Sequence, residues 1–358
     1  MEPSSSGGGS SQYSQLKPAW HASQLAELRA GREPRPVHVQ LILSDLCSQD
    51  CHFCSYRMST GLSTELFGTA ATHNPNRKIP TAKALEILED CAALGVKAVQ
   101  FTGGGEPTVH PDHLAIFARA QELGLETALV TNGVRLDATH PGVQAMTWVR
   151  VSVDAGSADV YARIRRCPPW HWTSAWANIT TLARSDFFKG VLGVGFVVTL
   201  ENFHGIAAAA RRARDSGAHN MRIGAVFSKF GMAYYGDQLQ AIHDAIAEAR
   251  AAADGGGFKI IDLFGRRLGD LEAGAPEDSE CYYQYLTMYI GGDLNVYRCC
   301  NTAYTTAGKV GSLATTRLRD LVAAYAPFDA RGCQYCQFLG QNRVIKALVE
   351  QPEHVNFV

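Results

Sequence analysis

The chain reads VHVQLILSDLCSQDCHFC from Val37 to Cys54, an apolar alternation that leads directly into three cysteines. Apolar side chains at every second position as far as Leu43 predict a β-strand. The cysteines after it follow the spacing C-x3-C-x2-C, which gathers three thiolates on one short loop. A [4Fe–4S] cluster has four irons to ligate, so three local thiolates leave one iron open. The stretch therefore predicts a strand that delivers a chemically active cluster loop.

The length and composition are those of an ordinary globular protein. The 358 residues are 46% hydrophobic and 19% charged, with a formal net charge of −1. These values suit one barrel with a small appended domain and imply no general attraction to nucleic acid or membrane. No apolar run approaches the length of a membrane span. We therefore expect no membrane partner.

The N-terminal range 1–35, which begins Met1-Glu2-Pro3 and continues with serine and glycine, has no basic or apolar segment of a signal peptide. We expect it to be a flexible tail with one short helix at 25–29. Ten cysteines without an export signal indicate metal or cluster binding in a reducing compartment rather than disulfides. The sequence therefore predicts a cytoplasmic protein.

Strand-like and helix-like segments alternate beyond the tail. We expect six strands at 37–43, 96–102, 125–131, 148–153, 191–199 and 221–227. Helices are expected at 81–94, 110–123, 161–165, 172–184, 205–216 and 238–253, the first with Thr81 as its N-cap and Gly95 as its end. Such units predict parallel strands and an α/β fold, a partial (β/α)6 TIM-like barrel over 36–270.

Asp254 and the three glycines after it predict a break in this pattern. Beyond them we expect the alternation to stop. The remaining residues, 271–358, are predicted to form a small cysteine-rich domain.

Candidate functional residues follow the ends of consecutive strands. The cysteine loop follows the first strand, Gly103–Pro107 the second, Asn132 the third and Asp154 the fourth. Loops at the C-terminal strand ends carry the working groups of such barrels. The residues are therefore expected to meet in one site.

Together these residues resemble the radical S-adenosylmethionine (radical SAM) superfamily over roughly 37–230. The resemblance implies a [4Fe–4S] cluster whose open iron is chelated by SAM. One electron, from a low-potential donor such as flavodoxin or ferredoxin, then cleaves SAM to a 5′-deoxyadenosyl radical. That radical abstracts hydrogen from the substrate, and the protein positions the cofactor.

The resemblance also implies roles for individual residues. The cluster ligands would be Cys47, Cys51 and Cys54. The SAM-binding positions would be Phe53 near the adenine, Gly103, Gly104, Gly105 and Glu106 at the amino group, Ser152 and Asp154 at the ribose, Asn132 at the third strand end, and Asn202 at the polar end. The alternative for the three cysteines is a structural zinc site with His52 or a distant residue as the fourth ligand.

Five further cysteines form a C-terminal group, Cys281, Cys299, Cys300, Cys333 and Cys336. The segments 293–300, 308–313 and 333–336 resemble the SPASM/Twitch extension of this superfamily. Leu294 stands at a usual glycine position, and too few cysteines follow for two auxiliary clusters. The pattern favours one auxiliary [4Fe–4S] cluster on Cys281, Cys299, Cys333 and Cys336. Whether Cys299 or Cys300 ligates stays open, with Cys299 preferred, and a zinc ribbon is the alternative.

Two segments bear on the substrate. Residues 58–80 form a long insertion expected to be a lid at the barrel mouth. Residues 163–172 combine cations with aromatics, which suits a phosphate or stacked base, although a solvated helix end with core tryptophans is preferred.

The function expected from the resemblance is hydrogen abstraction from a peptide or small metabolite. One alternative is modification of a nucleotide or nucleic-acid base. An alternative of another class is a non-catalytic iron–sulfur protein for electron transfer or scaffolding. The substrate, the catalytic residues beyond the cofactors and the oligomeric state are left unassigned by the sequence.

Overall fold

The computed structural model describes residues 13–57, 74–324 and 327–350, and within them the strands form a single ten-stranded sheet. Its strand order is β10-β9-β8-β1-β2-β3-β4-β5-β6-β7. Strands β1 to β7 pair in parallel with their neighbours, as expected for strand–helix units. They are β1 (His38–Leu41), β2 (Ala98–Phe101), β3 (Glu126–Thr131), β4 (Trp148–Ser152), β5 (Val191–Val198), β6 (Asn220–Ala225) and β7 (Lys259–Asp262). The predicted partial parallel barrel is confirmed.

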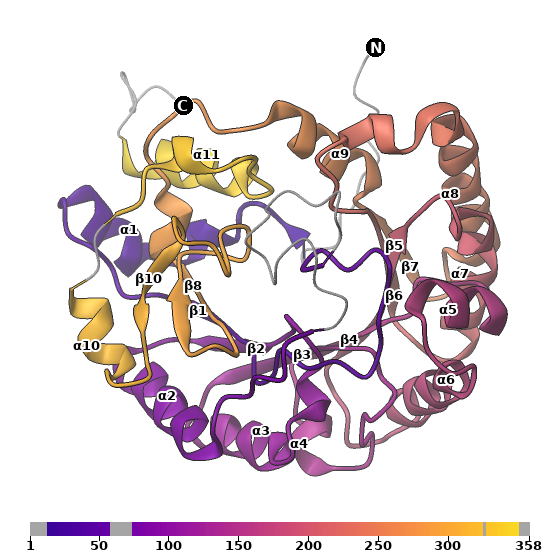
Figure 1. Ribbon diagram of the computed structural model, residues 1–358, viewed down its shortest axis with the longest axis horizontal. Helices are drawn as coiled ribbons and strands as arrows, with labels where there is room; N and C mark the ends of the chain where they lie inside the picture. The colour runs from indigo at the N-terminus through magenta and orange to yellow at the C-terminus, as the bar shows by residue number, and fades with distance from the viewer. Residues whose placement is uncertain (1–12, 58–73, 325–326, 351–358) are drawn as a thin grey trace.

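Helices cover the outer face of this sheet, and the strands line the inside of the ring (Figure 1). They are α2 (Thr81–Leu94), α3 (His113–Glu122), α4 (Pro141–Gln144), α5 (Ala158–Arg165), α6 (Trp170–Ala183), α7 (Ile206–Asp215) and α8 (Leu239–Ala253). Helix α2 ends at Gly95 in a left-handed conformation, as predicted. The predicted N-cap is wrong: Pro80 is the cap residue, and the Thr81 hydroxyl donates to Asp112 instead.

The core lies between the strands and these helices. In β5, Leu192, Val194, Phe196 and Val198 are at most 1% exposed and point outward. The intervening positions of each strand point into the barrel, because successive side chains of a strand alternate between faces. Helix packing therefore uses one face of each strand and leaves the other to line an interior space.

The alternation continues beyond the glycine run, so the predicted break is wrong. Gly255, Gly256 and Gly257 all have positive φ and make a tight turn, closed by hydrogen bonds between Gly255 and Phe258. Strand β7 follows at once and pairs with β6, and α9 (Phe264–Ala273) packs against β6. The strand escaped prediction because the glycine run directly before it indicated the end of the barrel; it is no shorter than β1 and β2, which were predicted.

The C-terminal segment joins the same sheet on the other side of β1. Strand β8 (Thr287–Ile290) pairs in parallel with β1, and β9 (Asn295–Tyr297) and β10 (Lys309–Ser312) continue antiparallel. Helix α10 (Leu318–Ala323) then packs on α2. The segment is thus continuous with the barrel sheet, and a domain boundary near residue 270 stays a prediction.

Residues from the predicted N-terminal tail contact the end of the chain. A short 3-10 helix at Lys17–Trp20 and α1 (Ala22–Arg29) pack against α11 (Leu339–Val349). The Arg29 Nε donates to the Leu348 carbonyl at 2.7 Å. Figure 1 shows α1 and α11 beside each other near β8. Within the described part of the chain, no helix is long and apolar enough to cross a membrane.

The docking of α10 on α2 depends on Arg317 and the buried Asp90. Their guanidinium and carboxylate make a two-pronged contact, with Nη2 at 2.7 Å from Oδ1. We predict that Arg317→Met lowers the urea midpoint of unfolding, because the buried Asp90 then keeps only the weaker contact with Arg319, at 4.0 Å, among its ion pairs with described residues. Arg331→Met is the control, since its pair with Asp329 is exposed and should leave the midpoint unchanged. Equal midpoints for the two variants would contradict the prediction.

Candidate active site

The cysteine loop follows β1 and is held by the end of α5. The Asp50 and His52 amides donate to the Arg165 and Ile164 carbonyls at 3.0 and 3.1 Å. The Cys54 amide closes a turn on the Cys51 carbonyl at 3.1 Å. The carbonyls at the end of a helix have no partner within the helix, so they can accept hydrogen bonds from the loop. These bonds hold the loop backbone in place although it forms no helix or strand.

The three thiols of this loop are close enough to affect one another. Burial raises the pKa of Cys47, Cys51 and Cys54, that of Cys54 to about 12, and neighbouring Cys51 raises the pKa of Cys47 and Cys54 further. Crowded thiols of this kind become thiolates only beside positive charge, which a metal centre supplies.

In the described residues, no three His, Cys, Asp or Glu side chains converge tightly enough to hold one metal ion. A cubane cluster, in contrast, takes each thiolate on a different iron. The donor set therefore fits a three-cysteine cluster site better than a single-ion site.

The proposed fourth zinc ligand, His52, faces away from the thiols. Its Nδ1 lies 3.1 Å from the Ile164 carbonyl, and its Nε2 lies 3.3 Å from the Glu201 carboxylate. Both ring nitrogens thus have partners outside the cysteine loop. The zinc alternative loses the one ligand that the sequence offered nearby.

The glycine element, Gly103–Gly105, follows β2 and lies directly against the segment that leads into the cysteine loop. A Cβ on Gly105 would come within 2.3 Å of the Asp45 and Leu46 carbonyl oxygens. The Glu106 amide donates to the Leu46 carbonyl at 2.9 Å, and the Asn74 amide group bridges the carbonyls of Asp45 and Gly104. Glycine is required here because only a bare backbone permits such close approach.

Glu106 connects the glycine element to the end of β3. Its carboxylate accepts hydrogen bonds from the amides of Thr108 and Asn132 and from the hydroxyls of Thr108 and Thr131. Burial raises the pKa of Glu106, while these four donors act in the opposite direction. Glu106 thus holds the loop after β2 to the end of β3. Its role at the amino group of SAM stays a prediction.

Asp154 forms a buried ion pair that the sequence did not reveal. Its carboxylate binds the guanidinium of Arg165 and accepts from the Val197 amide at 2.6 Å. Arg165 also donates to the Val153 carbonyl and to Gln49 of the cysteine loop. Burial opposes the charge on Arg165, yet the Asp154 carboxylate keeps its pKa raised. The pair ties the end of β4 to the cysteine loop.

The other predicted cofactor residues lie at the same barrel end. Asn132 donates to the Ser48 hydroxyl at 3.0 Å. Asn202 donates to the Asp154 and Val197 carbonyls, both at 2.8 Å, and so braces the loop after β5. Phe53 is buried in the core, and Ser152 ends β4 on its inward face. The structure thus brings the predicted set together, and the role of each at SAM stays a prediction.

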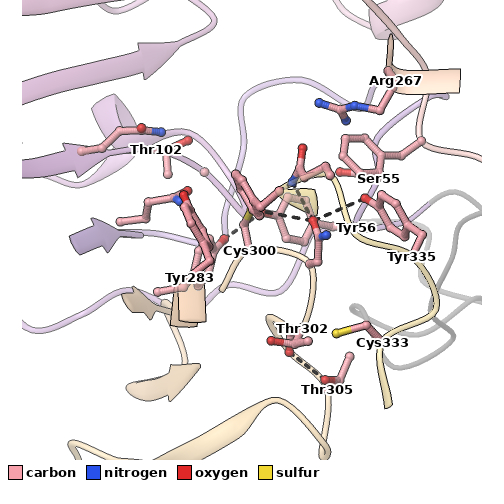
Figure 2. A pocket seen from close by; sticks show the side chains of 18 of the residues that line it. Ser55, Tyr56, Thr102, Arg267, Tyr283, Cys300, Thr302, Thr305, Cys333 and Tyr335 are labelled. Atoms are coloured by element: carbon pink, nitrogen blue, oxygen red, sulfur yellow. Dashed lines mark hydrogen bonds between the residues drawn. The ribbon is translucent and has the colours of Figure 1, made fainter. Parts of the chain in front are cut away.

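A cavity of about 580 Å³ opens beneath these loops and extends down the barrel. It reaches from Ser55, Tyr56 and Thr102 at the loop end to His38 and Trp148 at the start of their strands. Figure 2 shows Thr102 and Tyr283 on one side of it, and Arg267 and Tyr335 on the other. Its volume is that of a small-molecule or peptide side-chain site.

Four of the C-terminal cysteines form a second group beside this cavity. Burial raises the pKa of Cys281, and neighbouring Cys299, Cys336 and Cys333 raise it further. Cys299 acts likewise on Cys333 and Cys336. Cys300 instead lines the barrel cavity and accepts from Gln337 at 3.2 Å. This arrangement favours Cys299 over Cys300 as the ligand, and the assignment stays a prediction.

The two segments expected to bear on the substrate have different outcomes. None of residues 163–172, all of which are described, lines the barrel cavity. Trp172 is buried beside Trp176, as expected of a core tryptophan, whereas Trp170 is 58% exposed and Arg165 is buried against Asp154. The preferred interpretation as a solvated helix end with core tryptophans therefore holds only in part. Residues 58–73 of the predicted lid lie outside the described residues.

Sequence reasoning missed the inward-facing arginines of the barrel, Arg150 and Arg222. A signal was present, because Trp148, Arg150 and Ser152 alternate with the buried Val149 and Val151. The alternation shows which side chains face inward once the strand is placed in a barrel.

Residues 41–213 match the family model of the Radical SAM superfamily. The PqqA peptide cyclase of Methylorubrum extorquens (strain PA1) is 29% identical over 197 residues, which cover 53% of this chain and 48% of that protein. The S-adenosylmethionine-dependent nucleotide dehydratase of Flammeovirga pacifica is 30% identical over 119 residues, 33% of this chain and 38% of that protein. The chain thus spans about half the length, or less, of these curated relatives.

A solved structure has the same fold. It is Streptococcus suis SuiB bound to its precursor peptide SuiA, with a TM-score of 0.58 at 15% identity. The match covers 85% of this chain and 68% of that one, so it extends beyond the barrel into the C-terminal segment.

The buried pair of Asp154 and Arg165 provides a test of the site. We predict that Arg165→Met lowers the free energy of unfolding by about 3–5 kcal/mol, because Asp154 is left buried without its partner. Iron bound after anaerobic reconstitution should fall as well, since Gln49 of the cysteine loop loses its donor. Arg166→Met is the control, because Arg166 is exposed and lies 3.7 Å from Asp50. Wild-type stability and iron in the Arg165 variant would refute the bracing role.

The neighbouring cysteines Cys299 and Cys300 test the auxiliary site. Two cubane clusters hold about eight irons per chain. We predict that Cys299→Ala lowers the iron content by about half after reconstitution, whereas Cys300→Ala leaves it unchanged. Iron and sulfide analysis of both variants measures this. The reverse result would assign Cys300 as the ligand.

Proposed function

Since residues 41–213 match the family model of the radical SAM superfamily, we propose that the protein is an enzyme of this superfamily that abstracts hydrogen from a peptide or small-metabolite substrate. One observation carries the proposal. The cysteine loop and Gly103–Glu106 meet at the mouth of the barrel cavity. A cofactor held there would lie directly above a substrate in the cavity, as a reaction between the two requires.

The chain's own residues hold and orient the cofactors in this proposal. Cys47, Cys51 and Cys54 would ligate the [4Fe–4S] cluster, and the bare backbone of the glycine element would receive SAM. When bound, the reduced cluster and SAM supply the hydrogen-abstracting radical. Glu106 and Asp154 keep the loops in register, because their carboxylates already bind neighbouring backbone groups. The walls of the cavity shield the reacting atoms from water.

A second cluster on Cys281, Cys299, Cys333 and Cys336 is part of the proposal. Cys333 lines the cavity, so the cluster would lie beside the substrate. It would bind the substrate or accept an electron from it, and the second role leads to net oxidation or crosslinking. The reducing electron for the first cluster would come from flavodoxin or ferredoxin. The ten cysteines, all within the described residues, are free thiols, which supports a cytoplasmic location.

We place a peptide first among the substrate classes. The PqqA peptide cyclase, by its name, acts on a peptide, and its similarity covers 53% of this chain. Modification of a nucleotide stays the second candidate, because a nucleotide dehydratase is also similar over 33% of this chain. The segment 163–172, from which a base-binding role was considered, does not support it, since the segment lies outside the cavity.

Cleavage of SAM tests the proposed activity directly. We predict that the anaerobically reconstituted protein forms 5′-deoxyadenosine from SAM when dithionite is added, measured by chromatography and mass spectrometry. Cys54→Ala should abolish the product, because a cluster ligand is lost. Cys91→Ala should retain it, since Cys91 is a buried core thiol of α2 outside both groups. Absence of product from wild-type protein with full iron content would favour a non-catalytic iron–sulfur protein.

A further inference from the structure

Three arginines from separate elements meet inside the barrel cavity. Arg150 lies on β4, Arg222 on β6 and Arg267 on α9, and all three line the same space. Arg150 and Arg222 occupy inward positions, because the residues on either side of each are buried against the helices. Arg267 enters from the rim, where its guanidinium stacks on Phe227 at 4.2 Å. Figure 2 shows it on the side of the cavity that carries Tyr335.

Strand β5 leaves room for these side chains. It lies between β4 and β6, with Gly193 opposite Arg150 and Gly195 opposite Arg222. A Cβ on Gly195 would contact the Arg150 side chain at 3.6 Å. Glycine within a strand weakens it, and often marks a place where another group approaches closely. Gly195 thus provides space for Arg150, whereas the space above Gly193 holds the Asn220 side chain, whose Oδ1 a Cβ there would approach to 2.6 Å.

The three arginines meet no carboxylate of the described residues within the cavity itself. Among the residues that the structure describes, no Asp or Glu lines the cavity, and none of the three arginines has an ion pair within 4 Å. Arg150 donates to the Tyr13 hydroxyl at 3.5 Å, and its guanidinium lies over the Trp148 ring. Burial and the charges of Arg150 and Arg267 lower the pKa of Arg222 to about 9.

A smaller cavity of about 210 Å³ adjoins the first and shares Arg222 and Arg267 with it. It contains Asp270, whose pKa is raised by burial, although the positive charges of Arg266 and Arg267 act in the opposite direction. This carboxyl therefore acts on Arg267 from a distance without pairing with it. Arg165 differs from these arginines, because it is buried in the same barrel and is paired with Asp154. The fold thus supplies a carboxylate to an arginine that has a structural role.

We propose that Arg150, Arg222 and Arg267 bind an oxyanion group of the substrate, most simply a carboxylate of an acidic peptide or small acid. A guanidinium presents planar pairs of donors that match the two oxygens of such a group. SAM carries a single carboxylate beside an ammonium and a sulfonium, so three clustered cations exceed its need. That the bound oxyanion belongs to a substrate rests on the proposed function. The arginines identify the chemical class of ligand that the cavity selects.

The test measures anion binding separately from SAM cleavage. We expect glutarate, added to the reconstituted full-length protein, to raise its melting temperature and to bind measurably by calorimetry. Arg222→Gln should weaken glutarate binding about 10-fold or more. It should also raise the melting temperature of the unliganded protein, because a half-buried charge without an ion-pair partner is removed. Arg211→Gln, on the exposed face of α7, is the matched control and should change neither quantity.

Inorganic phosphate in place of glutarate distinguishes the two sources of an oxyanion. Tighter glutarate binding assigns a carboxylate, and tighter phosphate binding assigns a phosphate ester, while both support the oxyanion site. The proposal is overturned if neither probe binds, if Arg222→Gln binds glutarate as the wild type does, or if the variant loses SAM affinity by the same factor. Loss of 5′-deoxyadenosine formation with intact glutarate binding would refute the proposed activity and leave the site standing.

Discussion

The ion pair between Asp154 and Arg165 is the contact on which the site depends. Both side chains are buried, and a buried charge is tolerated only with a well-placed partner. Arg165 donates to three acceptors at once: the Val153 carbonyl directly after β4, the Asp154 carboxylate and the side chain of Gln49 in the cysteine loop. Asp154 itself has a positive φ of 56°, an unfavourable conformation for a residue with a side chain. The pair stabilises this backbone and thereby sets the cysteine loop against the barrel.

The same barrel contains arginines of two kinds. Arg165 is neutralised by a carboxylate of the chain, whereas Arg150, Arg222 and Arg267 share a cavity in which no described residue supplies one. The first kind holds loops together and the second kind presents free donors. Because half-buried charges without ion-pair partners lower stability, their retention in one cavity indicates a ligand rather than a structural role.

The C-terminal segment completes the site through the sheet and not through a separate interface. Strand β8 extends the barrel beside β1, which brings Tyr304 to Asp45 at the start of the cysteine loop. Burial raises the pKa of Asp45 to about 6, and the hydrogen bond from Tyr304 acts in the opposite direction. The thiols of Cys300 and Cys333, far along the chain, thereby border the same cavity as Ser55 and Tyr56, which directly follow the first cysteine group.

Local patterns in the sequence determined the class of fold and the place of the site. Strand alternation, helix periodicity and the spacing of Cys47, Cys51 and Cys54 depend on near neighbours, so the chain alone reveals them. The glycine run at Gly103–Gly105 was recognisable for the same reason, although the carbonyls that exclude a Cβ came only from the structure. Strand β7 was missed, although it is no shorter than β1 and β2, because the glycine run before it indicated the end of the barrel.

Only the tertiary structure decided which distant groups meet. Arg165 pairs with Asp154, and Glu106 with Asn132, through closure of the barrel, which no local pattern encodes. Cys299 and Cys300 are adjacent in sequence, yet one lies with three other thiols and the other faces the cavity. Charge balance is likewise a property of a space and not of a segment. The net charge of −1 concealed a cavity whose described lining is cationic, because its arginines come from three separate elements.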